Sequence, residues 1–216
     1  MFNMFNKILD ILFPIRCISC KKPKIALCDN CISSISPSEK THNNQTRAIF
    51  SYQDNIIRKA LWSLKYRNNK PMARVFARLI LDFLLEDISE QNQFSADKII
   101  FVPIPISSSR QRKRGYNQVE LILKEMSFIK TDVSFICLFD VLYKIRGTRA
   151  QMEIKNRRER LQNIKNSFGI KNEHFVKGKK IIVVDDITTT GATLAEAARV
   201  LRAAGARNIS CLAIAH

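Results

Sequence analysis

After residue 50, four stretches of the chain carry apolar residues at helical spacing, and three of them have a residue typical of a helix end beside them. Asp54 is a favoured N-cap for the first stretch, and Pro71 suits the first turn of the second. Gly205 suits the position just after the last stretch. The predicted helices run from Asp54 to about Tyr66, from Pro71 to about Ile88, from Asn117 to about Met126 and from Thr193 to Ala204.

Short runs of β-branched and aromatic residues alternate with these helices. They predict strands around Phe50 and Tyr52, at Ile99–Val102, at Ile181–Val184 and at Asn208–Ala213, with mixed strand and turn signals over 133–141. This alternation over about 160 residues predicts an α/β fold with a doubly wound, mostly parallel sheet. Cys137 and Cys211 lie in apolar runs, and we expect both to be buried, inert strand thiols.

The other four cysteines form the pattern Cys-x2-Cys-x7-Cys-x2-Cys: Cys17, Cys20, Cys28 and Cys31. Each pair can turn both sulfurs toward one ion, and two pairs complete the tetrahedron of a structural zinc site. Two redox-active Cys-x-x-Cys motifs are the less favoured alternative, because no βαβ pattern surrounds them. We therefore predict an N-terminal helix and zinc knuckle over 1–36, a polar linker over 37–48 and a globular domain over 49–216.

The first fifteen residues are apolar at helical spacing, but polar side chains interrupt them and Pro14 ends the run. The stretch is too short and too polar to span a bilayer, and no small-residue cleavage site follows it. We expect no transmembrane segment and a cytoplasmic protein. An amphipathic helix that packs on its own protein is favoured over one that docks on a membrane or partner.

Charge narrows the range of ligands. The chain has 36 Lys and Arg against 19 Asp and Glu, for a formal net charge of +17. Such a protein is expected to meet polyanions or phosphorylated ligands. A lysine-rich solvated surface is the alternative for the many charges that are scattered singly.

The most informative segment joins the strand at Ile181–Val184 to the last helix. Asp185 and Asp186 stand at the carboxyl end of the strand, where ligands bind in sheets of this kind. A ribose diol or a magnesium ion would relieve their mutual repulsion. Gly191 lets the backbone of 188–193 come close to a phosphate, which N–H groups and threonine hydroxyls can bind. An acid pair that only caps the helix is the alternative.

The whole run Val183-Val-Asp-Asp-Ile-Thr-Thr-Thr-Gly-Ala-Thr193 resembles the 5-phosphoribosyl-1-pyrophosphate (PRPP) motif of type I phosphoribosyltransferases. The resemblance implies that Asp185 and Asp186, the predicted catalytic residues, bind the ribose hydroxyls. It implies that the 5′-phosphate is bound by Thr188, Thr189, Thr190, Gly191, Ala192 and Thr193. Mg²⁺ would accompany PRPP, held largely by the ligand and water.

Further motifs resemble the ComF family, which joins a four-cysteine zinc module to a phosphoribosyltransferase domain. They are Leu12-Phe-Pro14 before the cysteines, Leu64-Lys-Tyr-Arg67, Val102-Pro-Ile-Pro105, Arg114-Gly-Tyr-Asn-Gln118, and Gln151 with Arg160-Leu-Gln-Asn163 and Phe168. The resemblance implies a type I phosphoribosyltransferase fold for 49–216. It also implies a role in natural transformation, the uptake and handling of single-stranded DNA.

Basic residues surround the predicted site. Arg110-Gln-Arg-Lys-Arg114 follows a strand end, and guanidinium groups match pyrophosphate oxygens. We expect Lys113 and Arg114 to bind the pyrophosphate of PRPP. The basic segment 144–165 is either a ligand loop or part of a DNA surface, with Tyr116 and Tyr143 available to stack on bases.

No general acid–base constellation stands out, but phosphoribosyl transfer proceeds through an oxocarbenium-like centre that positioning and charge can stabilise. We predict a ComF-type protein that binds PRPP and Mg²⁺ and acts in handling single-stranded DNA. An active phosphoribosyltransferase with an unknown nitrogenous acceptor is the alternative. A third hypothesis is that residues 1–31 dock a ComFA-like helicase or translocase.

Overall fold

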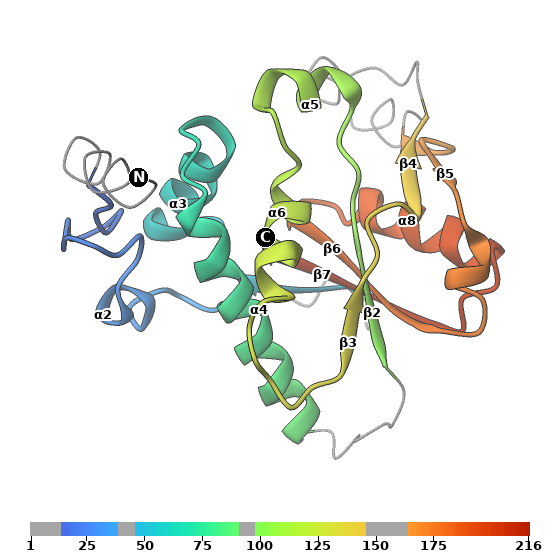
Figure 1. The fold of residues 1–216 in the computed structure, drawn as a ribbon, viewed down its shortest axis with the longest axis horizontal. Coiled ribbons are helices and arrows are strands. Elements are labelled where there is room, and N and C mark those ends of the chain that lie inside the picture. Colours follow the sequence, from blue (N-terminus) through green and yellow to red (C-terminus); the bar gives the residue numbers. More distant parts are fainter. Residues whose placement is uncertain (1–13, 39–45, 91–97, 146–163) are drawn as a thin grey trace, which may run out of the picture.

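A computed structural model describes residues 14–38, 46–90, 98–145 and 164–216. Its centre is a five-stranded sheet of order β1-β7-β6-β2-β3, and each neighbouring pair in it is parallel (Figure 1). The strands are β1 (Thr46–Phe50), β2 (Ile99–Pro103), β3 (Phe135–Cys137), β6 (Lys180–Ile187) and β7 (Asn208–Ala215). The predicted α/β fold with a parallel sheet is confirmed.

Helices cover both faces of this sheet (Figure 1). One face carries α3 (Asn55–Tyr66), α4 (Pro71–Glu90) and α6 (Gln118–Met126), and the other carries α8 (Ala192–Ala203). Because side chains alternate along a strand, β6 serves both layers. Ile181 and Val183 join the cluster under α8, while Ile182 and Val184 join the cluster under α3, α4 and α6.

Several boundaries differ from the sequence prediction. β1 starts at Thr46, inside the predicted linker, and Tyr52 lies in the turn after it. β6 continues through the acid pair to Ile187, because its last residues still pair with β7. Cys211 is buried as predicted, but Cys137 lies on the edge strand β3 and is only half-buried.

A second, two-stranded antiparallel sheet joins β4 (Leu142–Lys144) to β5 (Phe168–Ile170) beside α8. The remaining short elements are α2 (Asp29–Ile32), α5 (Ser108–Arg114) and the 3₁₀ turn η2 (Glu173–Phe175). Most of the basic segment 144–165, including Gln151 and Arg160, lies outside the described residues, as does the predicted helix before Pro14.

The cysteine segment packs directly on the helices of the main domain. Cys17 and Leu27 are almost fully buried, and they belong to the same apolar cluster as Leu61 of α3 and Phe76 of α4. Figure 1 places α2 at the α3 and α4 side of the molecule. The two parts of the chain therefore share one hydrophobic core.

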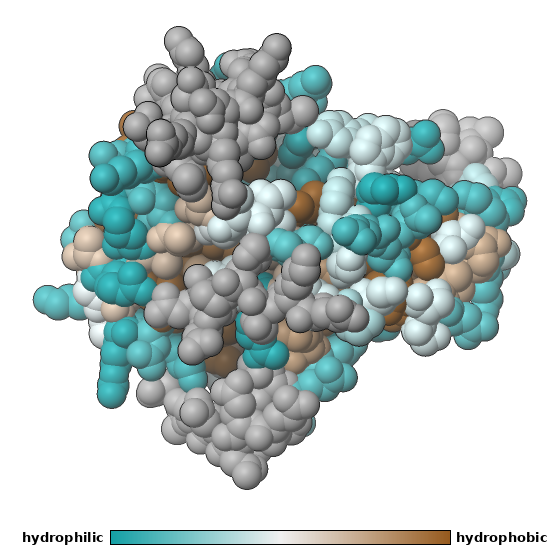
Figure 2. Space-filling model, turned by 180° about the vertical axis from the view of Figure 1, so that it is seen from behind, coloured by the Kyte–Doolittle hydropathy of each residue, from teal (hydrophilic) through white to brown (hydrophobic). Residues whose placement is uncertain are grey.

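The surface is largely polar on the face in Figure 2, where exposed apolar residues form small separate areas among the described atoms. Within the described part of the chain, none of the helices has the length and apolar character needed to cross a bilayer.

Glu196 of α8 fastens the segment that enters β5. Its carboxylate is 7% exposed and accepts a hydrogen bond from the Asn166 backbone N–H at 2.6 Å. Arg199 forms an ion pair with it at 2.8 Å and also donates to the Asn166 side chain. The bond from Arg199 and the Asn166 N–H together lower the pKa of Glu196 despite its burial.

We expect Glu196→Gln to lower the free energy of unfolding by about 1–3 kcal/mol at pH 7, because the buried acceptor loses its charge. A lowered pKa gives stability that is present above the ordinary value of 4.5 and is lost as pH falls through the folded-state value. The difference from wild type should therefore shrink in acid. Urea unfolding at pH 7 and pH 3 measures it, and equal stability at pH 7 would contradict the assignment.

Candidate functional site

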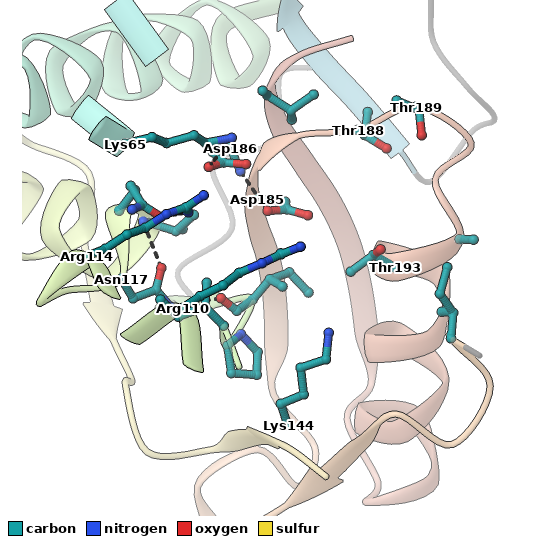
Figure 3. A pocket seen from close by; sticks show the side chains of 18 of the residues that line it. Lys65, Arg110, Arg114, Asn117, Lys144, Asp185, Asp186, Thr188, Thr189 and Thr193 are labelled. Carbon is teal, nitrogen blue, oxygen red and sulfur yellow. Dashed lines mark hydrogen bonds and ion pairs between the residues drawn. The ribbon is translucent and has the colours of Figure 1, made fainter. Parts of the chain in front are cut away.

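A cavity of about 610 Å³ opens at the carboxyl ends of β2 and β6 (Figure 3). Its wall combines the acid pair, the loop that enters α8, and basic side chains from α3, α5 and β4. Parallel strands end at the same edge of a sheet, so segments far apart in the sequence meet here. The volume suits a ligand of nucleotide size.

The acid pair lies among the last three residues of β6. Because side chains alternate along a strand, the two carboxylates point to different sides of the sheet. Asp186 points toward α3, where Lys65 forms an ion pair with it at 2.8 Å. Asp185 interacts with both Lys65 and Lys144 of β4 through their charges, and its Oδ1 accepts the Asp186 backbone N–H at 2.8 Å. Figure 3 shows Lys65 meeting Asp186 while Arg110 and Lys144 extend toward Asp185.

The surroundings of Asp185 and Lys144 shift the pKa values of both side chains. Burial, and then repulsion from Asp186, raise the pKa of Asp185 to about 7, although Lys65 and Lys144 oppose the shift. Burial lowers the pKa of Lys144, and the nearby Arg110 lowers it further. A carboxylate that ionises only near neutral pH is a common feature of binding and catalytic sites.

The loop 188–193 forms the opposite wall, and all six of its residues line the cavity. The Thr188 N–H donates to the Ala215 carbonyl at 2.9 Å, so it holds the loop to β7. The N–H groups and hydroxyls of the residues that follow, up to the first turn of α8, line the cavity and are of the kinds that bind a phosphate. At the C-terminal end of β7, the His216 ring lies 3.0 Å from the Thr189 carbonyl.

Gly191 is the N-cap of α8 and adopts a φ of +71°. A Cβ at this position would meet none of the described atoms within 4 Å. Backbone conformation therefore requires glycine here, and lack of space does not.

The basic wall comes from α5. Arg110 and Arg114 are one helical turn apart, and both line the cavity. Lys113 lies between them in sequence but on another side of the helix, where it is exposed and does not line the cavity. Arg114 is held in place, because it donates to Gln118 at 3.0 Å and to the Tyr66 hydroxyl at 3.2 Å.

The residues after α5 fix this wall to the rest of the domain. Asn117 is buried, caps α6 by accepting from the Val119 N–H, and donates to the Ile104 carbonyl at 2.9 Å. The Tyr116 hydroxyl donates to the Leu64 carbonyl of α3. Tyr116 is half-buried by this contact, so the motif Arg114-Gly-Tyr-Asn-Gln118 is chiefly a positioning segment.

The four cysteines of the N-terminal segment come together in space. Their Sγ atoms all lie within 4.8 Å of one another, and Cys28 Sγ lies 3.8 Å from Cys17 Sγ and 3.6 Å from Cys20 Sγ. Zinc–thiolate bonds of about 2.3 Å in a tetrahedron place the sulfurs about 3.8 Å apart. The cluster therefore has the donors and spacing to hold a metal ion of this kind.

The carboxyl-terminal part of the chain, residues 135–216, matches the phosphoribosyl transferase domain family. Over 154 residues the chain is 30% identical to competence protein F of Haemophilus influenzae. The aligned region covers 70% of this chain and 64% of that protein. It is 33% identical to competence protein ComFC of Streptococcus pneumoniae over 174 residues, 78% of this chain and 66% of that protein.

The chain belongs to the ComF family. It is also 31% identical to the DNA utilization protein YhgH of Salmonella typhimurium over 148 residues, 68% of this chain. The matches span 61% to 66% of the length of these three relatives.

Lys65 and Lys144 complete the ComF-family cavity, but sequence reasoning did not place them there. Lys65 belongs to the motif Leu64-Lys-Tyr-Arg67, but the motif itself does not indicate that Lys65 forms an ion pair with Asp186. Lys144 stood at the edge of a basic segment with many similar residues. The signal that could have found Lys65 is the need of two adjacent carboxylates for a cationic partner.

Proposed function

We propose that the cavity binds PRPP or a closely related ribose-5-phosphate ligand together with Mg²⁺. The observation that carries this proposal is the grouping, in one cavity, of two carboxylates, a phosphate-type loop and two arginines from α5. These are the three kinds of contact that a phosphorylated sugar with a second polyphosphate group requires.

Each part of the ligand has a matching wall. The ribose hydroxyls would meet Asp185 and Asp186, and the 5′-phosphate would meet the N–H groups and hydroxyls of 189–193. The pyrophosphate would meet Arg110 and Arg114, whose guanidinium groups can bind its oxygens in a bidentate manner. We favour Arg110 over the predicted Lys113, because only Arg110 lines the cavity.

Bound with PRPP, Mg²⁺ would neutralise pyrophosphate charge, and its other ligands would be mainly water. The protein groups would hold the sugar and stabilise positive charge at its anomeric carbon through Asp185 and Asp186. Transfer to a nitrogenous acceptor is a second candidate function, favoured by the match to the phosphoribosyl transferase domain family. Release of pyrophosphate in the presence of candidate acceptors tests that activity.

We further propose that this ligand site works within a protein that handles single-stranded DNA in the cytoplasm. The relatives named for competence and DNA utilization support this role, as does the net charge of +17. Zinc is the metal that best fits the four-thiol cluster. A ComFA-like helicase or translocase that docks on residues 1–31 remains part of the proposal. Loss of that partner on substituting the exposed Lys21, Lys22 and Lys24, with the fold retained, would support it.

Calorimetry with PRPP and Mg²⁺ tests the ligand, and two matched variants test the orientation. We expect Arg110→Ala to weaken binding by about tenfold to a hundredfold, because a charge-assisted contact is lost. Lys113→Ala removes the same charge from the same helix and should change affinity by less than about threefold. No measurable binding by the wild type, or equal losses in both variants, would contradict the proposed site.

A further inference from the structure

Helix α3 presents two aromatic side chains to solvent, one at the mouth of the cavity and one a helical turn farther out. Trp62 and Tyr66 are one helical turn apart, and they are 47% and 51% exposed. Their ring centroids are 5.8 Å apart, and the ring planes are inclined by 47°. The buried face of α3 is formed by other residues, including Leu61 and Leu64, so the two rings are not needed for the core.

Each ring has an arginine beside it. The Arg67 guanidinium carbon lies 4.7 Å from the Trp62 ring centroid, and that of Arg114 lies 5.1 Å from the Tyr66 ring centroid. Arg58 is exposed one turn before Trp62 on the same helix. Planar cations and aromatic rings thus alternate along one exposed strip, which we call the α3 strip: Arg58, Trp62, Tyr66, Arg67 and Arg114.

The two tyrosines that the sequence offered for stacking are less suited to it. Tyr116 is half-buried, and its hydroxyl donates to the Leu64 carbonyl of α3. The Tyr143 ring packs directly on Gly169, so closely that a Cβ added to Gly169 would lie 2.3 Å from the ring. Lys171 lies over the same tyrosine ring. The α3 strip combines greater exposure of its rings with a closer set of cations.

We propose that the α3 strip binds single-stranded nucleic acid by stacking bases on Trp62 and Tyr66. This inference rests on the proposed DNA-handling function and names the surface that performs it. Aromatic rings give a sequence-tolerant platform for unpaired bases, and the exposed Arg58 and Arg67 can bind the phosphates that link those bases. The α3 strip would lead a nucleic-acid strand toward the mouth of the ligand cavity, because Tyr66 belongs to the strip and also lines the cavity.

The extent of the strip favours a polymer over a free heterocycle. Tyr66 lines the cavity and could by itself hold one acceptor ring, but Trp62 lies a turn farther out and does not line the cavity. Arg58 and Arg67 extend the positive charge along the outer surface. Two platforms with flanking cations match successive nucleotides of a flexible strand.

Trp62 is the chain's single tryptophan, so its fluorescence reports on this surface alone. We expect an oligothymidylate of about 20 nucleotides to quench the emission of the full-length wild-type protein at low salt. An abasic oligonucleotide of the same length carries the phosphates without the bases, and it should bind with little quenching. Fluorescence anisotropy of a labelled strand gives the affinity in parallel.

We expect Trp62→Ala to weaken strand binding by at least about fivefold, and Trp62→Phe to retain most of the affinity. Phe128→Ala is the matched control, because Phe128 is 80% exposed and lies after α6. Circular dichroism and PRPP calorimetry of each variant exclude a folding defect.

The outcomes separate the inference from the function on which it rests. Strand binding without quenching, and with equal affinity for wild type and Trp62→Ala, would overturn the stacking surface while leaving DNA handling in place. Absence of strand binding by the wild type would overturn DNA handling itself. Stronger quenching by an RNA strand than by DNA would support the stacking surface and change its natural partner.

Discussion

Asp185→Asn is expected to make the ligand-free protein more stable and at the same time to weaken ligand binding. Burial and the adjacent Asp186 raise the pKa of Asp185 to about 7, so its ionised form is unfavourable in the folded state. Asparagine keeps the shape of the side chain and removes the charge that desolvation and Asp186 disfavour. We expect a gain of about 2 kcal/mol in the free energy of unfolding at pH 8, where wild type is ionised.

The sign of the pH dependence follows from the raised pKa. Below the ordinary value of 3.8 the carboxyl is protonated in both states and costs nothing. As pH rises from there toward about 7, the unfolded state loses its proton first, so the wild type becomes progressively less stable. The advantage of Asp185→Asn should therefore grow between pH 4 and pH 7 and remain constant above pH 7, as urea unfolding will measure.

The same substitution should reduce affinity for PRPP with Mg²⁺ by about tenfold to a hundredfold, since a charged acceptor is lost. Wild-type affinity should rise as pH increases through about 7, where Asp185 ionises. Asp186→Asn is the matched comparison, because it leaves Lys65 without its ion-pair partner and should give no comparable gain in stability. If Asp185→Asn were less stable than the wild type at pH 8, or bound PRPP with unchanged affinity, this account of Asp185 would be contradicted.

Cys28→Ser tests the proposed zinc site, and we expect the variant to bind no zinc and to lose much of its stability. Cys28 Sγ is close to two other sulfurs of the cluster, and the segment packs into the same core as α3 and α4. A structural zinc site contributes about 10 kcal/mol to folding in small modules, so losing one ligand should lower the free energy of unfolding by at least about 3 kcal/mol. Elemental analysis and thermal unfolding measure the two effects.

Cys137→Ser tests whether thiol loss alone explains the result. Cys137 lies half-buried on β3, away from the cluster, with its thiol 3.5 Å from the Leu123 carbonyl. This variant should retain one equivalent of zinc and lose less than about 1.5 kcal/mol of stability. If Cys28→Ser retained the metal or unfolded like the wild type, the proposed zinc site would not be structural. Because Leu27 and Cys17 share the main core, zinc loss should also destabilise the region proposed as a separate domain, 49–216.

The elements of the fold were predictable because they depend on local chemistry. Asp54 caps α3 as its position before an apolar helix predicts, with its Oδ1 accepting from the Ile56 N–H at 2.7 Å. Gly205, with a φ of +88°, follows the end of α8. The end of β6 was not predictable, because pairing with β7 extends the strand past Val184, where the continuous apolar run ends, through the acid pair to Ile187.

Local sequence was enough to predict the strand, acid pair and loop around residues 181–193 and the cysteine spacing, because these features depend on neighbours along the chain. Tertiary structure alone decided that Lys65 meets Asp186, that Arg110 and not Lys113 lines the cavity, and that Trp62 and Tyr66 are exposed together. Those facts depend on which edge of the sheet and which side of each helix face one another. Hydrophobic periodicity specifies the buried side of a helix, but it does not specify which polar residues meet across space.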